Sequence, residues 1–504
     1  MHFYSVKNKK VLLFILLLMI SSPLFSQNGE INNGAEPNNI IYIINSFVFE
    51  VDGITRNFAL INTANLIVGE ELEGAAGLER YLQEKRQLLI NQRTLESVRI
   101  EYFTGEARAD GKYPVDIVIY VKDTWNIIAL PYPKYDSNSG FEFIIKARDY
   151  NFLGTMQPLM IDLGYRYDRQ GRSFYNILID SDIPFEFLGL PWSVNFDNYF
   201  DYRPDLDEPF YYKNVTGLSV DLPVFSTTLK VGFDESITVN DEISTGVFQT
   251  LYLTSRPYIS WRIPTGLDFF NLGDLTYNVR FSAVFNHELP QYPLPADKAE
   301  PVLNFSHSLG FGRFYWIGNF KSGIYGSISN AYSFYFYNLN NDIEPLAANL
   351  IITGVGHFIL NDFMGVSARF MYRQYFNTMN ENAGDVLRGI LIKNVKADYM
   401  LSMNLEIPIR ILRFEPSQWF NSTSWRLLDL DLHMIPLIDA ALYRDPVNNI
   451  SFSPENLLLT AGLEFIAYPD FFRSLFFRVA FGINFSGFRY NDEYEIFLGM
   501  EFYY

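Results

Sequence analysis

The sequence contains no cysteine among its 504 residues, so disulfide bonds, thiolate chemistry and cysteine-ligated metals are excluded. After the N-terminus, no segment approaches the roughly 18 uncharged apolar residues of a transmembrane helix. The glycine-framed serine, zinc-peptidase and phosphate-loop motifs are absent, and the five histidines are scattered. We therefore expect a protein that is not an enzyme and that holds no cofactor or metal.

Positive charge is also scarce, because the formal net charge is −18. A nucleic-acid partner is disfavoured, since it would require a basic surface. Aromatic residues are abundant instead, at 17% of the chain, with Tyr 34 and Phe 46. Soluble domains have little use for so many aromatics, whereas outer-membrane β-barrels place them in girdles at both bilayer interfaces.

The N-terminus has the pattern of a secretory signal peptide, residues 1–26. Lys7, Lys9 and Lys10 precede the apolar run Val11–Ile20, and small residues lead to a cleavage site after Ser26. Ten apolar residues are too few for the alternative, a membrane-anchoring helix. Cleavage would remove three lysines and bring the mature net charge to about −21.

Residues 27–39 resemble a flexible leader, and residues 40–124 a small α+β domain. We predict a strand at Ile40–Val51, a helix at Leu72–Asn91 and strands at Val98–Phe103 and Val115–Val121. This order resembles a POTRA domain (polypeptide-transport-associated), a class that binds extended chains by strand addition at a sheet edge. The alternative is a structural plug or spacer. The matching pieces are Phe47–Thr55, Val68-Gly69-Glu70, Thr94–Ile100 and Lys122–Trp125.

Residues 125–504 alternate apolar and polar residues in segments of about ten, which is typical of a transmembrane antiparallel β-barrel. Phe363–Tyr375 and Ser474–Phe485 are examples. We predict about sixteen strands, within a range of sixteen to eighteen, with uncertain boundaries before Asn382. Five strands follow the central stretch Asn382–Asp398: Lys396–Ile407, Arg426–Tyr443, Asn456–Ala467, Arg473–Phe485 and Glu493–Tyr504.

The central stretch Asn382–Asp398 does not alternate, and it carries Arg388 beside a glycine. We interpret it as a loop that folds back inside the barrel. In the flanking strands the apolar faces must contact lipid, which directs Glu406 and Asp439 into the lumen. A partly buried guanidinium requires such carboxylates, although Arg388 as an ordinary loop arginine in water is the alternative. Other inward acids, such as Asp429 and Asp431, are most simply solvated charges.

Leu387-Arg388-Gly389-Ile390 resembles the Val-Arg-Gly-Phe/Tyr motif of the BamA/TamA superfamily of outer-membrane assembly and secretion proteins. It matches at the arginine and glycine, and Ile390 replaces an aromatic residue. The resemblance implies that Arg388 and Gly389 dock in the lumen against Glu406 and Asp439. The turn Asn151–Thr155 resembles another family element, in which Met156 stands where a second glycine is expected.

The chain ends on a strand with Gly499, Phe502 and Tyr504, which resembles the C-terminal signal of barrel substrates. The resemblance as a whole implies a factor that folds and inserts β-barrel proteins into the bacterial outer membrane, with its POTRA domain in the periplasm. Its expected partners are the outer-membrane bilayer, unfolded outer-membrane or secreted polypeptides, and periplasmic chaperones or accessory lipoproteins. The alternatives are a polypeptide secretion pore of the same superfamily and a passive channel.

Overall fold

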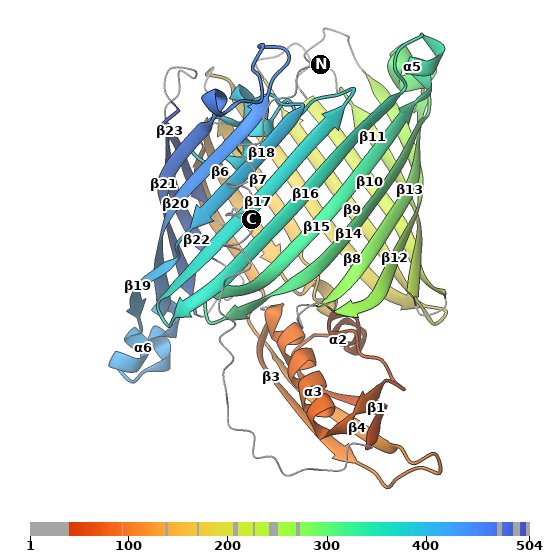
Figure 1. Ribbon diagram of the computed structural model, residues 1–504, viewed down its shortest axis with the longest axis vertical. Coiled ribbons are helices and arrows are strands. Elements are labelled where there is room, and N and C mark those ends of the chain that lie inside the picture. The colour runs from red at the N-terminus through yellow and green to blue at the C-terminus, as the bar shows by residue number, and fades with distance from the viewer. Residues whose placement is uncertain are drawn as a thin grey trace, which may run out of the picture.

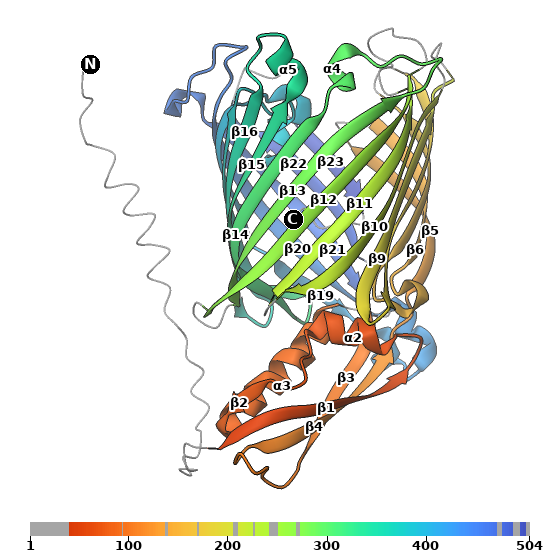
Figure 2. The ribbon, with the colours of Figure 1, turned by 90° about the vertical axis from the view of Figure 1, so that its right-hand side faces the viewer.

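The computed structural model describes residues 40–499, apart from 93, 137–139, 169–170, 205–209, 225–226, 241–249, 269–272, 471–475 and 487–493. The predicted signal peptide and leader lie outside the described residues. Across the described part of the chain, no helix is long and apolar enough to cross a membrane. Figures 1 and 2 show a large barrel with a small α+β domain below one end. We call that end of the barrel the near rim.

The barrel is a closed antiparallel sheet in which the strands pair in sequence order, with β18 and β19 together in one position, and β23 returns to β5. Closure satisfies the backbone hydrogen bonds that an apolar surrounding could not. Short helices α4 (Ala296–Ala299) and α5 (Phe336–Asn340) lie at the far rim (Figure 2). The strands are β5 Ile127–Asp136, β6 Gly140–Asp149, β7 Leu159–Tyr167, β8 Ser173–Phe187, β9 Leu190–Tyr202, β10 Phe210–Val224, β11 Thr227–Val239, β12 Leu251–Asp268, β13 Asp274–Glu288, β14 Val302–Ile317, β15 Phe320–Tyr335, β16 Leu346–Asn361, β17 Met364–Phe376, β18 Tyr399–Glu406, β19 Ile409–Phe414, β20 Leu430–Arg444, β21 Leu458–Pro469, β22 Phe477–Asn484 and β23 Tyr494–Gly499.

The number of strands lies at the upper end of the predicted range of sixteen to eighteen. β18 and β19 both pair with β17 on one side and with β20 on the other. Pro408 lies between them and has no N–H to donate to a ladder. They are therefore two parts of one interrupted strand, and the nineteen described segments fill eighteen positions. The strands beyond sixteen lie before Asn382, where the sequence left the boundaries open.

The predicted alternation holds on the strands that flank the central stretch. In β18, Ser402 and Asn404 are buried inside the barrel, whereas Met403 is exposed on the outer wall. In β20, Asp439 is buried and Ile438 is exposed. Large apolar side chains such as Phe281 are exposed around the outer wall. A closed barrel with this apolar exterior is a transmembrane β-barrel.

The α+β domain contains one sheet, in the order β2-β1-β4-β3, covered by two helices (Figure 2). Its core joins Ile44, Leu60, Leu78 and Ile117, and the predicted alternation of the last strand agrees with the burial of Val115, Ile117, Ile119 and Val121. The sequence missed the helix α2 and the short strand β2. The elements are β1 Ile41–Asp52, α2 Asn57–Ala64, β2 Glu71–Glu73, α3 Gly74–Asn91, β3 Leu95–Thr104 and β4 Tyr113–Asp123.

A tight turn at the start of the barrel, around η1 (Phe152–Gly154), fastens the α+β domain to it. The buried Asn151 amide donates to Thr55 Oγ1 at 2.7 Å and to Asp123 Oδ2 at 3.2 Å. A Cβ on Gly154 would lie 2.0 Å from a backbone oxygen of the domain. Met156 adopts a φ of 57°, the left-handed conformation that a glycine adopts readily, and its side chain enters the domain core. The turn is therefore a rigid joint.

The domain also contacts the near rim at two other places. From α3, Glu84 pairs with Arg313 of β14 at 2.7 Å, and Asn91 bonds to the backbone of β14. From β3, Glu96 pairs with Arg426 at 3.2 Å, in the link between β19 and β20. The joint at residues 151–156 and these contacts spread the attachment around the rim.

The contact at Glu96 predicts a pH dependence. Lys122 at 3.0 Å, and then Arg426, hold the pKa of Glu96 below its ordinary value. A depressed folded-state pKa means that the contribution of the contact is complete above about pH 4.3 and is lost as the pH falls through the lower folded pKa. We expect the distribution of distances between nitroxides on Ser97→Cys and Ser424→Cys to broaden in that acid range.

The Glu96→Gln variant should show the broad distribution at neutral pH as well. Glu101→Gln is the matched control, because Glu101 pairs with Arg99 within the same sheet. An unchanged distribution in acid would show that Glu96 does not hold the domain to the rim.

Candidate functional site: a loop docked in the barrel lumen

The segment between β17 and β18 turns back into the barrel interior. Asn380 and Ala397 pair through backbone hydrogen bonds of 2.8 and 3.0 Å, which join its two ends. Farther in, the Ala383 N–H donates to the Val395 carbonyl at 2.8 Å. Two 3-10 turns, η2 (Ala383–Val386) and η3 (Ile392–Asn394), flank the tip at residues 387–390. We call residues 377–398 the lumen loop.

Apolar packing anchors the tip of the lumen loop. Leu387 and Ile390 are almost fully buried, which contributes about 1.5–3 kcal/mol for each side chain. The barrel wall supplies an aromatic ring to this cluster, that of Tyr443 on β20. The buried cluster comprises Met371, Ala383, Val386, Leu387, Ile390, Val395, Ala397, Met400, Ala441, Tyr443 and Leu458.

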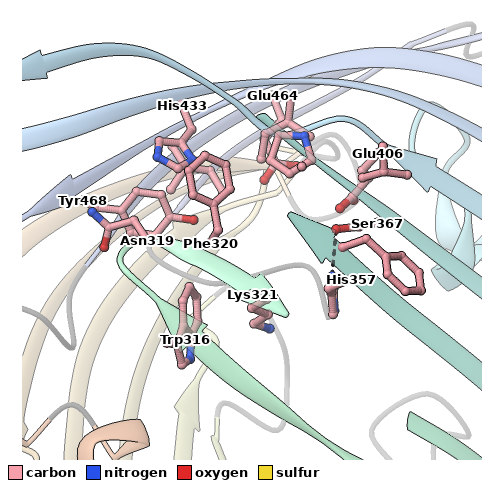
Figure 3. Close-up of a pocket in the computed structure, with 16 residues that line it drawn as sticks. Trp316, Asn319, Phe320, Lys321, His357, Ser367, Glu406, His433, Glu464 and Tyr468 are labelled. Atoms are coloured by element: carbon pink, nitrogen blue, oxygen red, sulfur yellow. Dashed lines mark hydrogen bonds between the residues drawn. The ribbon is translucent and has the colours of Figure 1, made fainter. Parts of the chain in front are cut away.

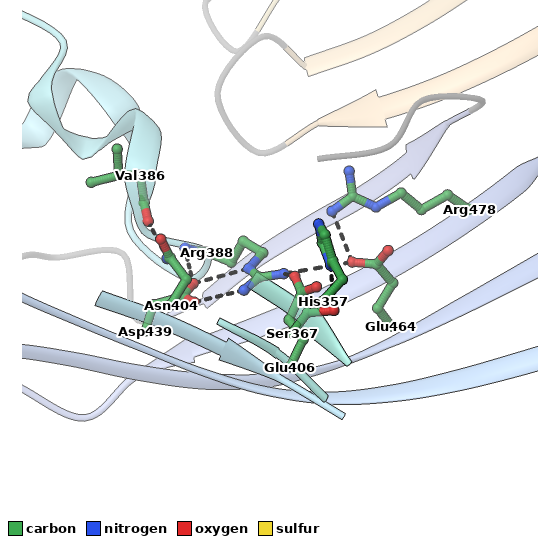
Figure 4. A network of polar contacts seen from close by, with 9 residues as sticks. All are labelled: His357, Ser367, Val386, Arg388, Asn404, Glu406, Asp439, Glu464 and Arg478. Atoms are coloured by element: carbon green, nitrogen blue, oxygen red, sulfur yellow. Dashed lines mark hydrogen bonds and ion pairs between the residues drawn. The ribbon is translucent and has the colours of Figure 1, made fainter. Parts of the chain in front are cut away.

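Arg388 lies among carboxylates from three strands (Figure 4). Its Nε and Nη2 donate to Asp439 Oδ2 and Oδ1 at 2.9 and 2.6 Å, the two-point geometry that suits a planar guanidinium. Its backbone N–H also donates to Asp439 Oδ2, at 2.9 Å. Nη1 bonds to Glu406 and lies 3.8 Å from Glu464 Oε2. One side chain of the loop therefore joins β18, β20 and β21.

The network continues to Arg478 of β22, whose Nη2 donates to Glu464 Oε2 at 2.9 Å (Figure 4). Two guanidinium groups thus face the carboxylates of Glu406, Asp439 and Glu464, with little exposure of any of the five side chains. Removing one partner from such a group leaves an uncompensated buried charge. The position of the lumen loop and the charge balance of the lumen are therefore coupled.

Gly389 brings the loop backbone against the wall. Its φ is +105°, and a Cβ there would lie 2.8 Å from the Ile483 nitrogen. A Cβ on Gly482 of β22 would lie 2.7 Å from Arg388 carbonyl carbon and from the Gly389 nitrogen. The Gly389 N–H donates to Glu495 Oε2 of β23 at 2.9 Å. The loop tip therefore contacts the last two strands of the barrel.

A second ion pair holds the loop farther from its tip. Arg373 of β17 donates from both Nη atoms to Asp385, at 2.7 and 3.1 Å. Asn404 of β18 donates to the Val386 carbonyl at 2.7 Å. Alternation already places Arg373 on the inner face, but its partner lies in a loop without periodicity, so no pattern indicated the pair.

A cavity of about 60 Å³ lies beside the charged network (Figure 3). His357 Nδ1 and Ser367 Oγ are 2.7 Å apart on its wall. His433 packs between the rings of Phe320 and Tyr468, with centroid distances of 4.6 and 4.9 Å. Within the described ranges, no group of three or more His, Asp or Glu side chains is arranged to hold a metal ion.

The seam between β23 and β5 closes the barrel. In the described part of this ladder, Phe497 pairs with Asp136 and Leu498 pairs with Tyr135. Tyr132 Oη donates to the Leu498 carbonyl at 2.9 Å from inside the barrel. Gly499 is buried there, and a Cβ on it would approach that hydroxyl to 2.5 Å.

The structure thus brings Arg388, Gly389, Glu406 and Asp439 together in the lumen and places Gly499 at the seam. Phe502 and Tyr504 lie outside the described residues. Sequence reasoning placed Arg478 and Gly482 on an inner face but did not assign them to the site, and it did not single out Glu464 or Glu495. Alternation along the predicted strand Asn456–Ala467 was a usable signal for Glu464. The close approach of two glycine backbones leaves no pattern in a single sequence.

No protein-family model and no curated protein matches this chain. Several solved structures are similar in fold. BamA from Haemophilus ducreyi lacking POTRA domains 1–3 shares 11% identity at a TM-score of 0.42, over 92% of this chain and 85% of that chain. CdiB from Acinetobacter baumannii shares 11% identity at a TM-score of 0.46, over 91% of this chain and 74% of that chain. CdiB from Escherichia coli shares 10% identity at a TM-score of 0.41, over 99% of each chain. Similarity at this level assigns no role to any residue.

Proposed function

We propose that this protein is an outer-membrane member of the BamA/TamA superfamily that folds and inserts other β-barrel proteins. The observation that carries the proposal is the lumen loop. Its Arg388 joins three strands, and its Gly389 contacts β22 and β23, beside the seam. A passive channel has no need of a buried arginine loop that braces the terminal strands.

The seam supports a templating role. Opening it would expose unpaired N–H and C=O groups on β5 and β23, and such edges readily pair with another strand. An unfolded client could therefore pair with the open edges and fold strand by strand. The docked loop would hold the neighbouring strands in place meanwhile.

The α+β domain supports a role in receiving the client. β2 pairs with the first three residues of β1, Ile41 to Ile43. Within the described chain, no strand pairs with residues 45–52 on that side of β1. The other sheet edge is β3. Both edges suit the strand addition by which POTRA domains bind extended chains. The periplasm is the compartment expected for this domain.

The test uses proteoliposomes that contain the purified protein and receive an unfolded small β-barrel. Folding of the client is followed by its heat-modifiable gel mobility. We expect faster folding than in empty liposomes, with loss in Arg388→Ala and in a variant lacking residues 40–122. Arg280→Ala is the matched control, because Arg280 lies over the Tyr258 ring on β12, away from the loop. Passage of polypeptide into the liposomes without client folding would instead support a secretion pore, and free passage of small solutes alone a passive channel.

A disulfide across the seam gives the second test. Tyr135 and Leu498 are directly paired and both face outward, so Tyr135→Cys with Leu498→Cys should form one bond in a chain without native cysteine. We expect the oxidised variant to fold clients no faster than empty liposomes, and reduction to restore the activity. The control pair is Phe465→Cys with Val479→Cys, between β21 and β22. Full activity with a locked seam would reject lateral opening.

A further inference from the structure

The link between β19 and β20 folds into a compact unit on the near rim (Figure 1). It contains α6 (Pro416–Trp419) and η4 (Thr423–Leu428), and we call residues 415–429 the rim foot. The buried Asp429 accepts the Ser417 N–H at 3.0 Å and also the Ser417 hydroxyl. The Ser422 N–H donates to the Ser417 carbonyl at 3.0 Å. These bonds give the foot a defined shape.

The foot presents apolar side chains outward. Trp419 and Phe420 are 61% and 62% exposed. The ring centroids of Trp419 and Phe414 are 5.0 Å apart, and those of Phe420 and Trp425 are 5.2 Å apart, so two ring pairs meet at the consecutive residues 419 and 420. A concentration of exposed large apolar side chains on one short link marks an interaction surface. Its residues, with their neighbours on β19, are Ile411, Leu412, Trp419, Phe420, Trp425, Leu427 and Leu428.

This patch is continuous with the outer wall of the barrel. Ile411 and Leu412 are exposed on β19 itself, and Leu428 leads into β20. Arg413 and Arg426 are about half exposed beside it, where they pair with Glu415 and Glu96. Tryptophan and arginine at the end of an apolar wall are the residues enriched at the boundary between acyl chains and headgroups. Arginine also matches phosphate geometry.

We propose that the rim foot lies in the membrane leaflet on the side of the α+β domain, with phospholipids as its partner. Trp419 and Phe420 enter the acyl boundary, and the two arginines lie at the level of the phosphates. Because Arg426 also bonds to Glu96, the foot holds the α+β domain close to the membrane surface. The proposal is independent of what the barrel does to its clients.

The test uses the absence of native cysteine. A nitroxide is placed on Phe420→Cys in the full chain, in liposomes of phosphatidylethanolamine and phosphatidylglycerol. Its collisions with lipid-soluble oxygen and with a water-soluble nickel chelate are compared with two references. Phe281→Cys reports the lipid-facing wall, and Glu106→Cys reports an exposed site of the α+β domain. We expect the oxygen-to-nickel ratio at 420 to follow that at 281.

A ratio that follows residue 106 would overturn the proposal, as would protection from both reagents, which would indicate a covering protein or a second copy. Replacing both Trp419 and Trp425 with alanine should lower the oxygen-to-nickel collision ratio of the label at 420. If Phe420→Cys does not fold, quenching of tryptophan fluorescence by brominated lipids replaces it. The quenched fraction should fall when Trp419 and Trp425 become phenylalanine, and an unchanged fraction would contradict membrane insertion.

Discussion

Replacing Arg388 with alanine should lower the free energy of unfolding by about 3–5 kcal/mol, the cost of leaving a buried charge unpaired. Asp439, Glu406 and Glu464 would then face one another with Arg478 as the remaining arginine of the network. Urea titration of the heat-modifiable form measures the loss. The Arg388→Lys variant should have a free energy of unfolding between those of the wild type and Arg388→Ala, because lysine keeps the charge and loses the two-point contact.

The control is again Arg280→Ala, which removes an arginine that faces the lumen at the ring of Tyr258. It should change the free energy of unfolding by no more than about 1 kcal/mol, the range of an exposed cation–π contact. The double variant Arg388→Ala with Asp439→Ala should lose less free energy of unfolding than the two single variants together. Each single change leaves the other charge buried without its partner, and the double change removes both. Additive losses would show that Arg388 and Asp439 do not form an energetic unit.

The sequence predicted the inner faces of the strands well, because the side-chain period of a strand is two and cannot drift. Once lipid was assigned to Leu401 and Met403, Glu406 had to face the lumen. The same argument on the next strand directed Asp439 inward. The structure adds that both carboxylates meet the same guanidinium. Predicting this shared contact would have required the path of the lumen loop, which the alternation of the strands does not determine.

Other elements had no usable signal. Helix α2 has eight residues, Arg56 at its N-cap without a side-chain cap, and no acid in its first turn. It forms because Ala59, Leu60 and Ala64 are buried against the domain, which is a tertiary effect. The interruption of β18 and β19 at Pro408 was equally hidden, since a proline can end a strand or divide one. The sequence therefore did not predict β19, which continues the strand that contains β18.

Replacing Gly389 with alanine should release the lumen loop. The left-handed φ alone costs about 1–2 kcal/mol for a residue with a Cβ, and this Cβ would meet backbone atoms of β22 at 2.8 to 3.0 Å. Backbone cannot move aside as a flexible side chain can. The undocked fraction should rise at least about five- to thirtyfold. Ala383→Cys, buried in the docked loop, reports undocking through its rate of reaction with a water-soluble maleimide.

Gly482→Ala should have the same effect from the opposite side, because its Cβ would meet Arg388 and Gly389 backbone atoms at 2.7 Å. Gly354→Ala of β16 is the matched control, since nothing lies within 4 Å of its Cβ position. The double variant Gly389→Ala with Gly482→Ala should be labelled only slightly faster than either single variant, because both changes disrupt the same contact between the loop tip and β22. Slow labelling in both single variants would mean that the loop stays docked without this approach, and that Arg388 and the apolar cluster suffice to hold it.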